Sequence, residues 1–329
     1  MPIVSHPHEF NQDDLYVDLR STLGAPLYLK CEGFNFTGSI KQKAAVEMIG
    51  AAERSGRLRP GSILVESSSG NLGVAMSVIA ASKGYQFVCV TDSRCNLGAR
   101  RLMEALGARV HVVKDPGSVG GFLEARIDYV RRLCESDERY VWLNQYVNSG
   151  NWRAHYGRTA PDIADRFPDV DVVFIGVGTS GTAMGCARWF REHRPSVRVV
   201  AVDSVGSVAF GGPAGTRMIP GLGAGIRPPL LDRDLVDDVC IVAETDTIRM
   251  CHRLARHGFL FGGSTGTVVT GALAWLAEQP FGADLTAVAI APDLGERYLD
   301  TVYQTNWVQD RFGSETLDFH GALVSSEVA

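Results

Sequence analysis

Short runs of β-branched and other apolar residues alternate with amphipathic stretches along most of this chain, and the alternation limits the folds open to it. The runs predict buried strands, and the stretches between them have apolar residues at helical spacing. Strands separated by helices form parallel sheets covered by helices on both faces, so an α/β fold is expected. The predicted strands are 62–66, 87–91, 110–113, 170–175, 197–202 and 287–291. The predicted helices are 72–83, 97–106, 122–134, 182–194, 248–257 and 266–277.

The length of 329 residues suits one large or two medium domains. We expect a small mobile domain over residues 37–148, and a larger cofactor-binding domain that combines residues 1–36 with residues 149–312. The Gly- and Pro-rich segment 211–225 is predicted to be a long ordered loop with a function. The polar stretch 313–329 is expected to be frayed.

Composition argues against several classes of protein. A net charge of -5 does not suit a general binder of nucleic acids or anionic membranes. No apolar run approaches membrane-spanning length, and the N-terminus has no signal pattern. The 7 cysteines are scattered without a C-x-x-C pair, so neither a zinc site nor a disulfide framework is indicated. We therefore expect a cytoplasmic protein that has reduced thiols and no metal, and that acts on small molecules.

Lys41 is the first residue that suggests chemistry. It follows a turn-forming Gly-Ser pair at the expected start of a helix. Lysine is unfavourable near the positive end of a helix, so its presence favours a role in which the amine is neutral or bound to an aldehyde. A solvated lysine is the common case for this residue type, and Lys43 is the second candidate. The case for Lys41 depends on the segments that accompany it.

The sequence Ser-Ser-Ser-Gly-Asn at 67–71 follows a predicted strand and opens a predicted helix. One serine could serve as a helix cap, but three serines followed by Gly-Asn exceed what a cap needs. Ser68, Ser69 and nearby backbone N–H groups are the predicted contacts of a substrate α-carboxylate. The Asn71 amide is predicted to meet a ring hydroxyl of a cofactor. Together with Lys41, this pattern indicates an amino acid bound to lysine-anchored pyridoxal 5′-phosphate.

A second glycine-rich turn, 176–182, also lies between a predicted strand and a predicted helix. Its backbone N–H groups and threonine hydroxyls are predicted to hold a phosphate. The same glycines match G-x-G-x-x-G, and Asp203 lies where a ribose-binding acid is expected, so an NAD-dependent oxidoreductase is an alternative. The hydroxyl content fits a single phosphate monoester better than a pyrophosphate. The predicted phosphate-binding residues are Gly178, Thr179, Ser180, Gly181 and Thr182.

Ser264 lies in a third glycine-rich segment, 261–266, which is either a simple helix start or part of the site. In the functional interpretation its hydroxyl meets the pyridine nitrogen of the cofactor. A carboxylate there would keep the nitrogen protonated and make the ring a strong electron sink. A hydroxyl makes a weaker sink, which favours prompt loss of a β-leaving group over a long-lived carbanion.

From Pro26 to about Thr301, the chain resembles the fold-type II pyridoxal-phosphate enzymes of the cysteine synthase and cystathionine β-synthase family. The matching blocks, in order, are 30–35, 38–41, 69–71, 107–108, 144–146, 178–182, 221–225 and 295–298. The resemblance implies a fold like that of the tryptophan synthase β-subunit, and by analogy a homodimer. The roles it implies are Lys41 as the Schiff-base lysine, Asn71 at the cofactor 3′-hydroxyl, 178–182 at the phosphate, Ser264 at the ring nitrogen, and Ser68, Ser69 and Gln145 at the substrate carboxylate.

Departures from the sulfhydrylases of this family suggest a branch. Leu72 replaces a threonine, Ser180 replaces a glycine, and 92–97 replaces their Met-Ser-x-Glu-Arg-Arg segment. These features look most like the N-(2-amino-2-carboxyethyl)-L-glutamate synthases, which begin 2,3-diaminopropionate synthesis for siderophores and peptide antibiotics. The resemblance implies β-replacement on O-phospho-L-serine through an α-aminoacrylate, with L-glutamate as the amine nucleophile.

Two further alternatives stay open at this point. One is a cysteine synthase that uses O-acetyl- or O-phosphoserine, and the other is a non-catalytic binding or regulatory relative. A phosphorylated substrate needs positive groups near the leaving oxygen atoms. The sequence offers four candidates for this role and for the glutamate carboxylates, which are Arg94, Arg100, Arg217 and Arg227.

Overall fold

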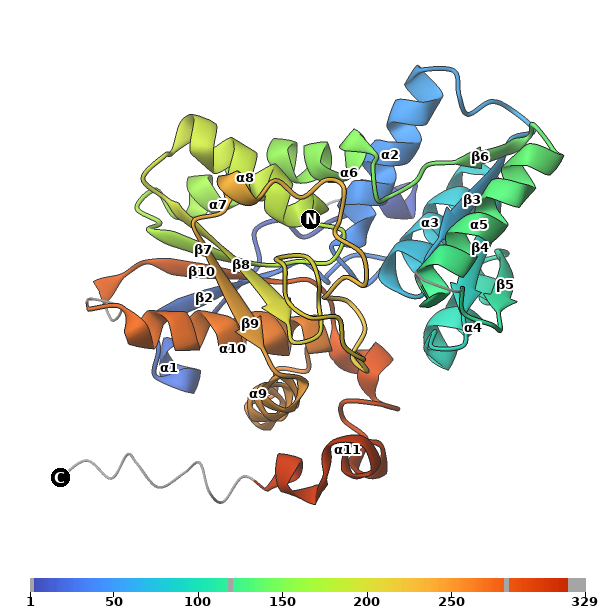
Figure 1. Ribbon diagram of the computed structural model, residues 1–329. Coiled ribbons are helices and arrows are strands. Elements are labelled where there is room, and N and C mark those ends of the chain that lie inside the picture. The colour runs from blue at the N-terminus through green and yellow to red at the C-terminus, as the bar shows by residue number, and fades with distance from the viewer. Residues whose placement is uncertain (1–2, 118–120, 281–283, 319–329) are drawn as a thin grey trace.

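The computed structural model describes residues 3–117, 121–280 and 284–318, and the strands within these ranges form two sheets (Figure 1). The larger sheet contains, in spatial order, β1 (Tyr16–Asp18), β2 (Leu27–Cys31), β10 (Ala287–Ala291), β7 (Val172–Gly176), β8 (Arg198–Ser204) and β9 (Asp238–Val242). The smaller sheet contains, in spatial order, β5 (Arg109–Val113), β4 (Gln86–Asp92), β3 (Ile63–Ser67) and β6 (Tyr140–Trp142). Among these described strands, β1 is antiparallel to β2 and the other pairs are parallel.

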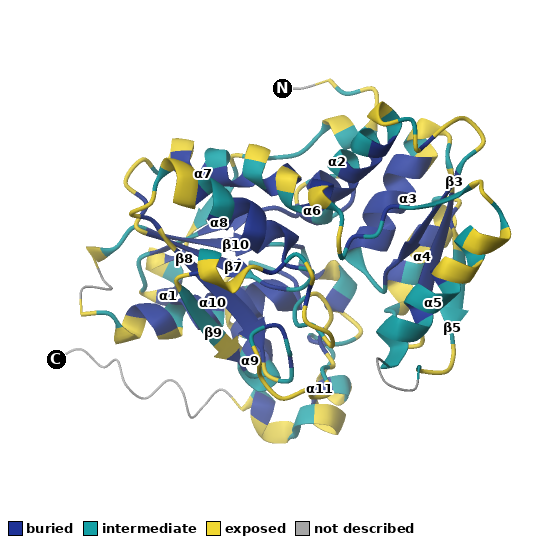
Figure 2. Ribbon diagram, turned by 45° about the horizontal axis from the view of Figure 1, so that its top comes forward, coloured by how far each residue is buried: buried dark blue, intermediate teal, exposed yellow. Residues whose placement is uncertain are grey.

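Helices cover both faces of the larger sheet. They are α1 (Arg20–Leu23), α6 (Ser149–Ala154), α7 (Ala160–Arg166), α8 (Gly181–His193), α9 (Glu244–Arg256) and α10 (Gly263–Glu278). In β7, Val172 and Phe174 belong to the core shared with α10, while Val173 and Ile175 belong to the core shared with α7 and α8. A strand that is buried on both faces has a continuous apolar sequence, which is why runs rather than alternation predict these strands. Figure 2 shows the central strands as buried and the edge strands β5 and β9 as partly buried.

The smaller sheet is also enclosed by helices, which are α2 (Lys41–Arg54), α3 (Asn71–Lys83), α4 (Leu97–Ala105) and α5 (Gly121–Ser136). Leu64 of β3 belongs to the core formed with α2, α3 and α4, and Val65 packs on the opposite face with Val130 of α5. Asn96 fixes the start of α4, because its Oδ1 accepts hydrogen bonds from the N–H groups of Gly98 and Ala99. Within the described residues, no helix is long and apolar enough to cross a membrane.

The predicted α/β fold with helix-covered, mainly parallel sheets is confirmed. Element ends differ from prediction by a few residues: α10 begins at Gly263, and α9 begins at Glu244. Glycine, serine and threonine are poor helix formers in general but are tolerated in a first turn, so sequence pattern places these starts too late. The sequence analysis does not predict β1, β2, β6 and β9. For β1 and β6 the reason is length, because three residues are too few to show a period.

The expectation that 313–329 is frayed is wrong for its first part. Gly313, at a φ of 84°, ends α11 (Thr305–Phe312), and the chain then forms the 3₁₀-helix Ser314–Leu317. Thr316 is buried, and its hydroxyl donates to the Phe312 carbonyl at 2.8 Å. Leu317 packs on the apolar cluster that contains Tyr298. Residues 319–329 lie outside the described part of the chain.

This packing predicts that Leu317→Ala lowers the free energy of unfolding by about 1–2 kcal/mol, because a half-buried leucine leaves its cluster. Leu299→Ala is the matched control, since the Leu299 side chain is exposed and its loss should change stability little. Urea unfolding of the two variants compares them directly. Equal stabilities would mean that the segment does not dock.

Candidate active site

One buried carboxylate, Asp293, joins the two sheets. It follows β10, is fully buried, and accepts three hydrogen bonds. Its Oδ1 accepts from Ser264 Oγ at 2.7 Å, and its Oδ2 accepts from Tyr298 Oη at 2.6 Å and from Asn71 Nδ2 at 2.8 Å. Asn71 begins α3 beside the smaller sheet, whereas Ser264 lies in α10 beside the larger one. Asp293 thus brings together two residues that the sequence predicts at the cofactor ring.

Arg297 holds the other end of the Asn71 amide. Its Nη1 donates to Asn71 Oδ1, and its Nη2 donates to the carbonyl of Thr37. The backbone carbonyl of Arg297 accepts from Asn96 Nδ2 at 2.9 Å. Gly38 has a φ of 66°, and a Cβ there would lie 2.9 Å from the guanidinium, so both backbone conformation and space favour glycine. The segment 293–297 therefore ties the larger sheet to α2, α3 and α4.

Lys41 begins α2 next to this segment. The preceding residues bridge to it, because Ser39 pairs with Asp293 and the Ile40 N–H donates to the Pro292 carbonyl at 2.8 Å. Burial lowers the pKa of Lys41, and the nearby Asp293 carboxylate opposes this in part. Within the described residues, Lys41 Nζ makes no hydrogen bond or ion pair. An amine with a lowered pKa is neutral more of the time and hence a better nucleophile.

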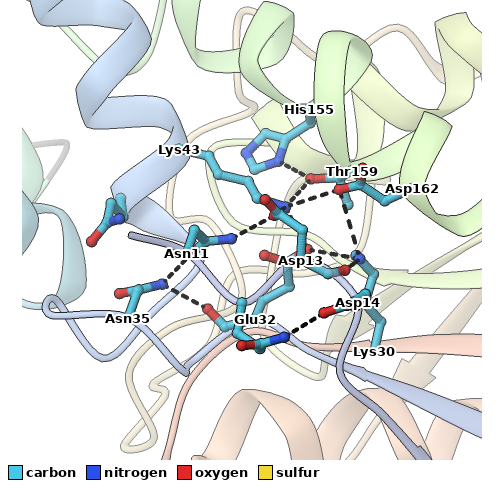
Figure 3. Close-up of polar contacts among 12 residues, drawn as sticks. Asn11, Asp13, Asp14, Lys30, Glu32, Asn35, Lys43, His155, Thr159 and Asp162 are labelled. Atoms are coloured by element: carbon cyan, nitrogen blue, oxygen red, sulfur yellow. Dashed lines mark hydrogen bonds and ion pairs between the residues drawn. The ribbon is translucent and has the colours of Figure 1, made fainter. Parts of the chain in front are cut away.

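Lys43, the second lysine candidate, is held in a buried ion cluster (Figure 3). Its Nζ lies 2.9 Å from Glu32 Oε1 and 2.7 Å from Asp13 Oδ1. Burial alone would lower the pKa of Lys43, but the Glu32 and Asp13 carboxylates outweigh burial and raise it. A lysine that stays charged and paired does not suit imine formation, so the geometry favours Lys41.

The serine-rich turn lies beside Gln145, as the predicted carboxylate site requires. Gly70 is the N-cap of α3, and Ser68 Oγ accepts from the N–H groups of Gly70 at 3.3 Å and Gly73 at 3.0 Å, so Ser68 supports the helix start. Ser69 is partly exposed at the helix start. Gln145 is buried, and its Nε2 donates to the Ser67 carbonyl at 2.8 Å. The structure therefore brings Ser68, Ser69 and Gln145 into one region, with Ser68 in a partly structural role.

Glu66 is a buried residue of this region that the sequence analysis does not identify. Its carboxylate accepts from Trp142 Nε1 at 2.9 Å, the Ser67 N–H at 2.9 Å and the Gln145 N–H at 3.3 Å. Burial raises its pKa to about 7, although these hydrogen bonds oppose the rise. Glu66 thus fixes the backbone of two segments that flank the predicted carboxylate site.

The predicted phosphate loop wraps tightly around the start of α8. A Cβ at Gly181 would lie 2.1 Å from Asn151 Oδ1, and a Cβ at Gly178 would lie 3.0 Å from the Gly221 carbonyl. Gly221 belongs to the long irregular loop 211–225, which therefore borders this site. Two loop hydroxyls are engaged from behind: Thr179 Oγ1 accepts from Asn151 Nδ2 at 3.0 Å, and Thr182 Oγ1 lies 3.3 Å from His155 Nε2.

Ser180 and Asp203 bear on the alternative of a dinucleotide site. Ser180 Oγ donates to the Thr179 carbonyl at 2.6 Å, so this proton is already used within the loop. Asp203 is fully buried, and its Oδ1 accepts from the Ser204 N–H at 2.8 Å. A ribose-binding acid needs to face the ligand. The geometry of Asp203 therefore does not support the dinucleotide alternative.

Arg126 is a buried cation that the sequence analysis does not single out. Its Nε lies 3.3 Å from Asp92 Oδ2 without a hydrogen-bond partner in the described chain. Its charge also reaches Tyr146, whose hydroxyl lies 3.4 Å from the Ser67 carbonyl. Arg126 is four residues from Val130 on the buried side of α5, and an arginine in an apolar stripe is the signal that could have identified it.

The four arginine candidates from the sequence differ in position. Arg94 is exposed and stacks over the Phe122 ring at 4.9 Å, and Arg100 pairs with Glu104 on the exposed side of α4. Arg217, in the loop 211–225, donates to the carbonyl of Gly206, which precedes that loop, and Arg227 is exposed. Of these four, Arg94 lies nearest to a buried acid, because its Nε is 3.7 Å from Asp92 Oδ1.

The Asp293 geometry predicts that Asp293→Asn lowers the free energy of unfolding by about 1–3 kcal/mol. An amide keeps the shape but presents an N–H₂ group to at least one of the three donors, which loses its acceptor. Asp300→Asn, at an exposed position, is the control and should have little effect. Chemical unfolding measures both, and a neutral Asp293→Asn would show that the carboxylate does not hold the site together.

Known proteins resemble this chain over most of its length. A family model described as pyridoxal-phosphate dependent enzyme matches residues 16–293. An N-(2-amino-2-carboxyethyl)-L-glutamate synthase of Ralstonia nicotianae is 41% identical over 288 residues, which cover 86% of this chain and 84% of that protein. One from Cupriavidus metallidurans is 40% identical over 298 residues, covering 89% and 87%. The solved cysteine synthase of Entamoeba histolytica is 29% identical with a TM-score of 0.84, covering 92% of this chain and 91% of that one.

These likenesses confirm the predicted cofactor, the predicted type II fold and the prediction of a β-substituting enzyme. They agree with the geometry of Asp203, which does not support the dinucleotide alternative. The chain belongs to the pyridoxal-phosphate dependent enzyme family, as a transferase with the fold of the cysteine synthases.

Proposed function

We propose that this enzyme joins the amine of L-glutamate to Cβ of O-phospho-L-serine, giving N-(2-amino-2-carboxyethyl)-L-glutamate and phosphate. The observation that carries this proposal is the convergence of Lys41, Asn71 and Ser264 on Asp293 in a chain about two-fifths identical to synthases of that name. The product fits a route to 2,3-diaminopropionate. The alternative of a cysteine synthase uses the same site residues and differs in the nucleophile.

The residues present fit pyridoxal phosphate. When bound, this cofactor supplies an electron-accepting ring that stabilises the charge left when an α-proton is removed. We assign Lys41 Nζ to the aldehyde carbon, Asn71 and Ser264 to the ring, and the loop 178–182 to the phosphate. The assignment is supported by the position of this loop at the start of α8, because a helix N-terminus favours an anion, and by the two threonine hydroxyls that other side chains hold there.

Lys41 also has the properties of the base that the reaction needs. Its lowered pKa favours a neutral amine that can remove the substrate α-proton and later return it to the same carbon. Ser69, the start of α3 and Gln145 are assigned to the substrate carboxylate, because a helix N-terminus favours an anion. The serine-rich turn connects β3 of the smaller sheet to α3, within residues 37–148. We propose that this part of the chain closes over the substrate.

Arg126 is assigned to the phosphate of the substrate. The Cβ–O bond breaks with its electron pair on the departing phosphate, and the glutamate nitrogen then bonds to Cβ and loses a proton. A dianionic leaving group is stabilised by a nearby guanidinium. Arg126 lies near Tyr146, whose hydroxyl is 3.4 Å from the Ser67 carbonyl of the serine-rich turn.

Product analysis tests the proposed reaction. The purified holoenzyme is given O-phospho-L-serine with L-glutamate and sulfide together, and mass spectrometry is expected to find N-(2-amino-2-carboxyethyl)-L-glutamate with an equal amount of released phosphate. Cysteine as the main product would replace the proposal by the cysteine synthase alternative. Lys41→Ala should form neither product, because it lacks the amine, whereas Lys114→Ala changes an exposed lysine and should behave like the parent.

The assignment of Arg126 predicts a change in leaving-group preference. Arg126→Gln should lower kcat/KM for O-phosphoserine by about ten- to a hundredfold, because one charge-assisted contact is lost. The value for O-acetylserine, whose leaving group carries less charge, should fall much less. The ratio of the kcat/KM values for the two substrates cancels any general loss of activity that comes from disturbing the buried Asp92–Arg126 pair. Arg101→Gln changes an exposed arginine and is the control. A ratio unchanged from the parent would contradict the role.

A further inference from the structure

A buried ion cluster lies beside His155 and Thr159, which lie between α6 and α7 in the chain (Figure 3). Lys43 is at its centre, and its ammonium contacts Glu32, Asp13 and, at 3.7 Å, Asp162. The same Nζ also donates to Thr159 Oγ1 at 3.3 Å. The side chain of Lys43 is only 1% exposed, so it cannot itself reach a ligand outside the cluster. Of its two contacts in the α6–α7 segment, Thr159 and Asp162, Thr159 is the one that also contacts His155.

These contacts continue from Thr159 to His155. The π-helical turn His155–Thr159 places Thr159 Oγ1 3.0 Å from His155 Nδ1. An ammonium can only donate, so Thr159 Oγ1 accepts from Lys43 and its own proton is free for Nδ1. Burial, with the charges of Lys43 and Lys41, holds the pKa of His155 well below its ordinary value, so the ring is neutral. A neutral ring that accepts at Nδ1 has its proton on Nε2.

The Nε2 proton faces the phosphate loop. Thr182 Oγ1 lies 3.3 Å from His155 Nε2, and in this tautomer it accepts, which leaves the Thr182 proton to point into the loop. Thr179 is arranged in the same way, because Asn151 Nδ2 donates to its Oγ1 at 3.0 Å. Ser180 is the exception, since its hydroxyl donates to a backbone carbonyl. Two of the three loop hydroxyls are therefore oriented as donors by side chains of the segment before α7.

We propose that His155 is a positioning residue of the cofactor-phosphate site, which as the Nε2–H tautomer connects buried Lys43 through Thr159 to Thr182 and holds the Thr182 proton toward the phosphate. The donors then run in one direction, from Lys43 to Thr159, to His155, to Thr182 and to the ligand. This inference rests on the proposed assignment of the loop 178–182 to the phosphate. A dianion accepts hydrogen bonds only, so a hydroxyl that is already oriented as a donor binds it without rearrangement.

Cofactor binding to the full-length chain tests this role without measuring turnover. Dissociation constants are compared for pyridoxal phosphate and for pyridoxal, which lacks the phosphate. His155→Leu is expected to weaken pyridoxal phosphate binding about ten- to a hundredfold and to leave pyridoxal binding unchanged. His155→Gln, which keeps an N–H donor, should recover part of the loss. His257→Leu removes an exposed histidine and is the control.

A second pair of variants separates this inference from the assignment of the loop. Thr182→Val should give a loss of the same kind as His155→Leu, and the double variant should bind no more weakly than Thr182→Val alone. If Thr182→Val leaves both ligands unaffected, the loop assignment itself fails and the inference fails with it. If Thr182→Val weakens the binding of pyridoxal phosphate alone, the loop assignment stands. The role of His155 is then overturned if His155→Leu leaves pyridoxal phosphate binding unchanged, or if His155→Leu weakens the binding of both ligands equally.

The tautomer gives a readout that does not depend on any folding defect of the variants. In ¹⁵N-histidine-labelled holoenzyme, the His155 signal can be assigned by its absence from His155→Gln. The expected spectrum has the proton on Nε2 and an unprotonated Nδ1. A proton on Nδ1 would reverse the direction of both hydrogen bonds and overturn the proposal.

Discussion

The hydrogen bonds to a single buried carboxylate hold this site together. An unpaired charge in a protein interior costs several kcal/mol, so a fully buried Asp293 requires donors around it. The donors come from the start of α3, from α10 and from the 3₁₀-helix Gly295–Tyr298. Burial and the Asp293 carboxylate raise the pKa of Tyr298 well above its ordinary value, so its hydroxyl stays a donor. Satisfying this one acid therefore fixes the relative position of segments from both sheets.

Two lysines in one helical turn illustrate how the same side chain acquires different chemistry. Lys41 and Lys43 are two residues apart, so they project from α2 about 200° apart. Lys43 enters a cluster of carboxylates and its pKa is raised, while Lys41 is desolvated with little compensation and its pKa is lowered. Lys43 keeps its charge and its ion pairs, whereas Lys41 is suited to the proposed covalent chemistry. The first turn of one helix thus serves both purposes.

Sequence predicts the α/β fold here because the central strands of both sheets are largely apolar runs, as in Val172–Gly176, whereas β1, β2, β6 and β9 are not predicted. Short local segments such as 67–71 and 178–182 predict parts of the site, since their chemistry depends on neighbours in the chain. The role of Asp293 cannot be predicted in this way, because its partner Asn71 lies 222 residues away in the sequence and no local motif contains both residues. His155 and Arg126 are missed for the same reason: their significance depends on which groups packing places beside them.

The π-helical turn His155–Thr159 joins α6 to α7, and the resulting continuous helical segment contacts two different parts of the protein. A residue adds about 100° of rotation in an α-helix, whereas a π-helical turn uses five residues for about the rotation that four α-helical residues give. Before the turn, Asn151 points to the phosphate loop; after it, Ile163 and Ala164 join the apolar layer beneath α8. Deleting one residue here would restore an α-helical turn and leave both faces directed at the same neighbours. A single-residue gap in alignments of related chains is therefore expected to fall inside this five-residue window.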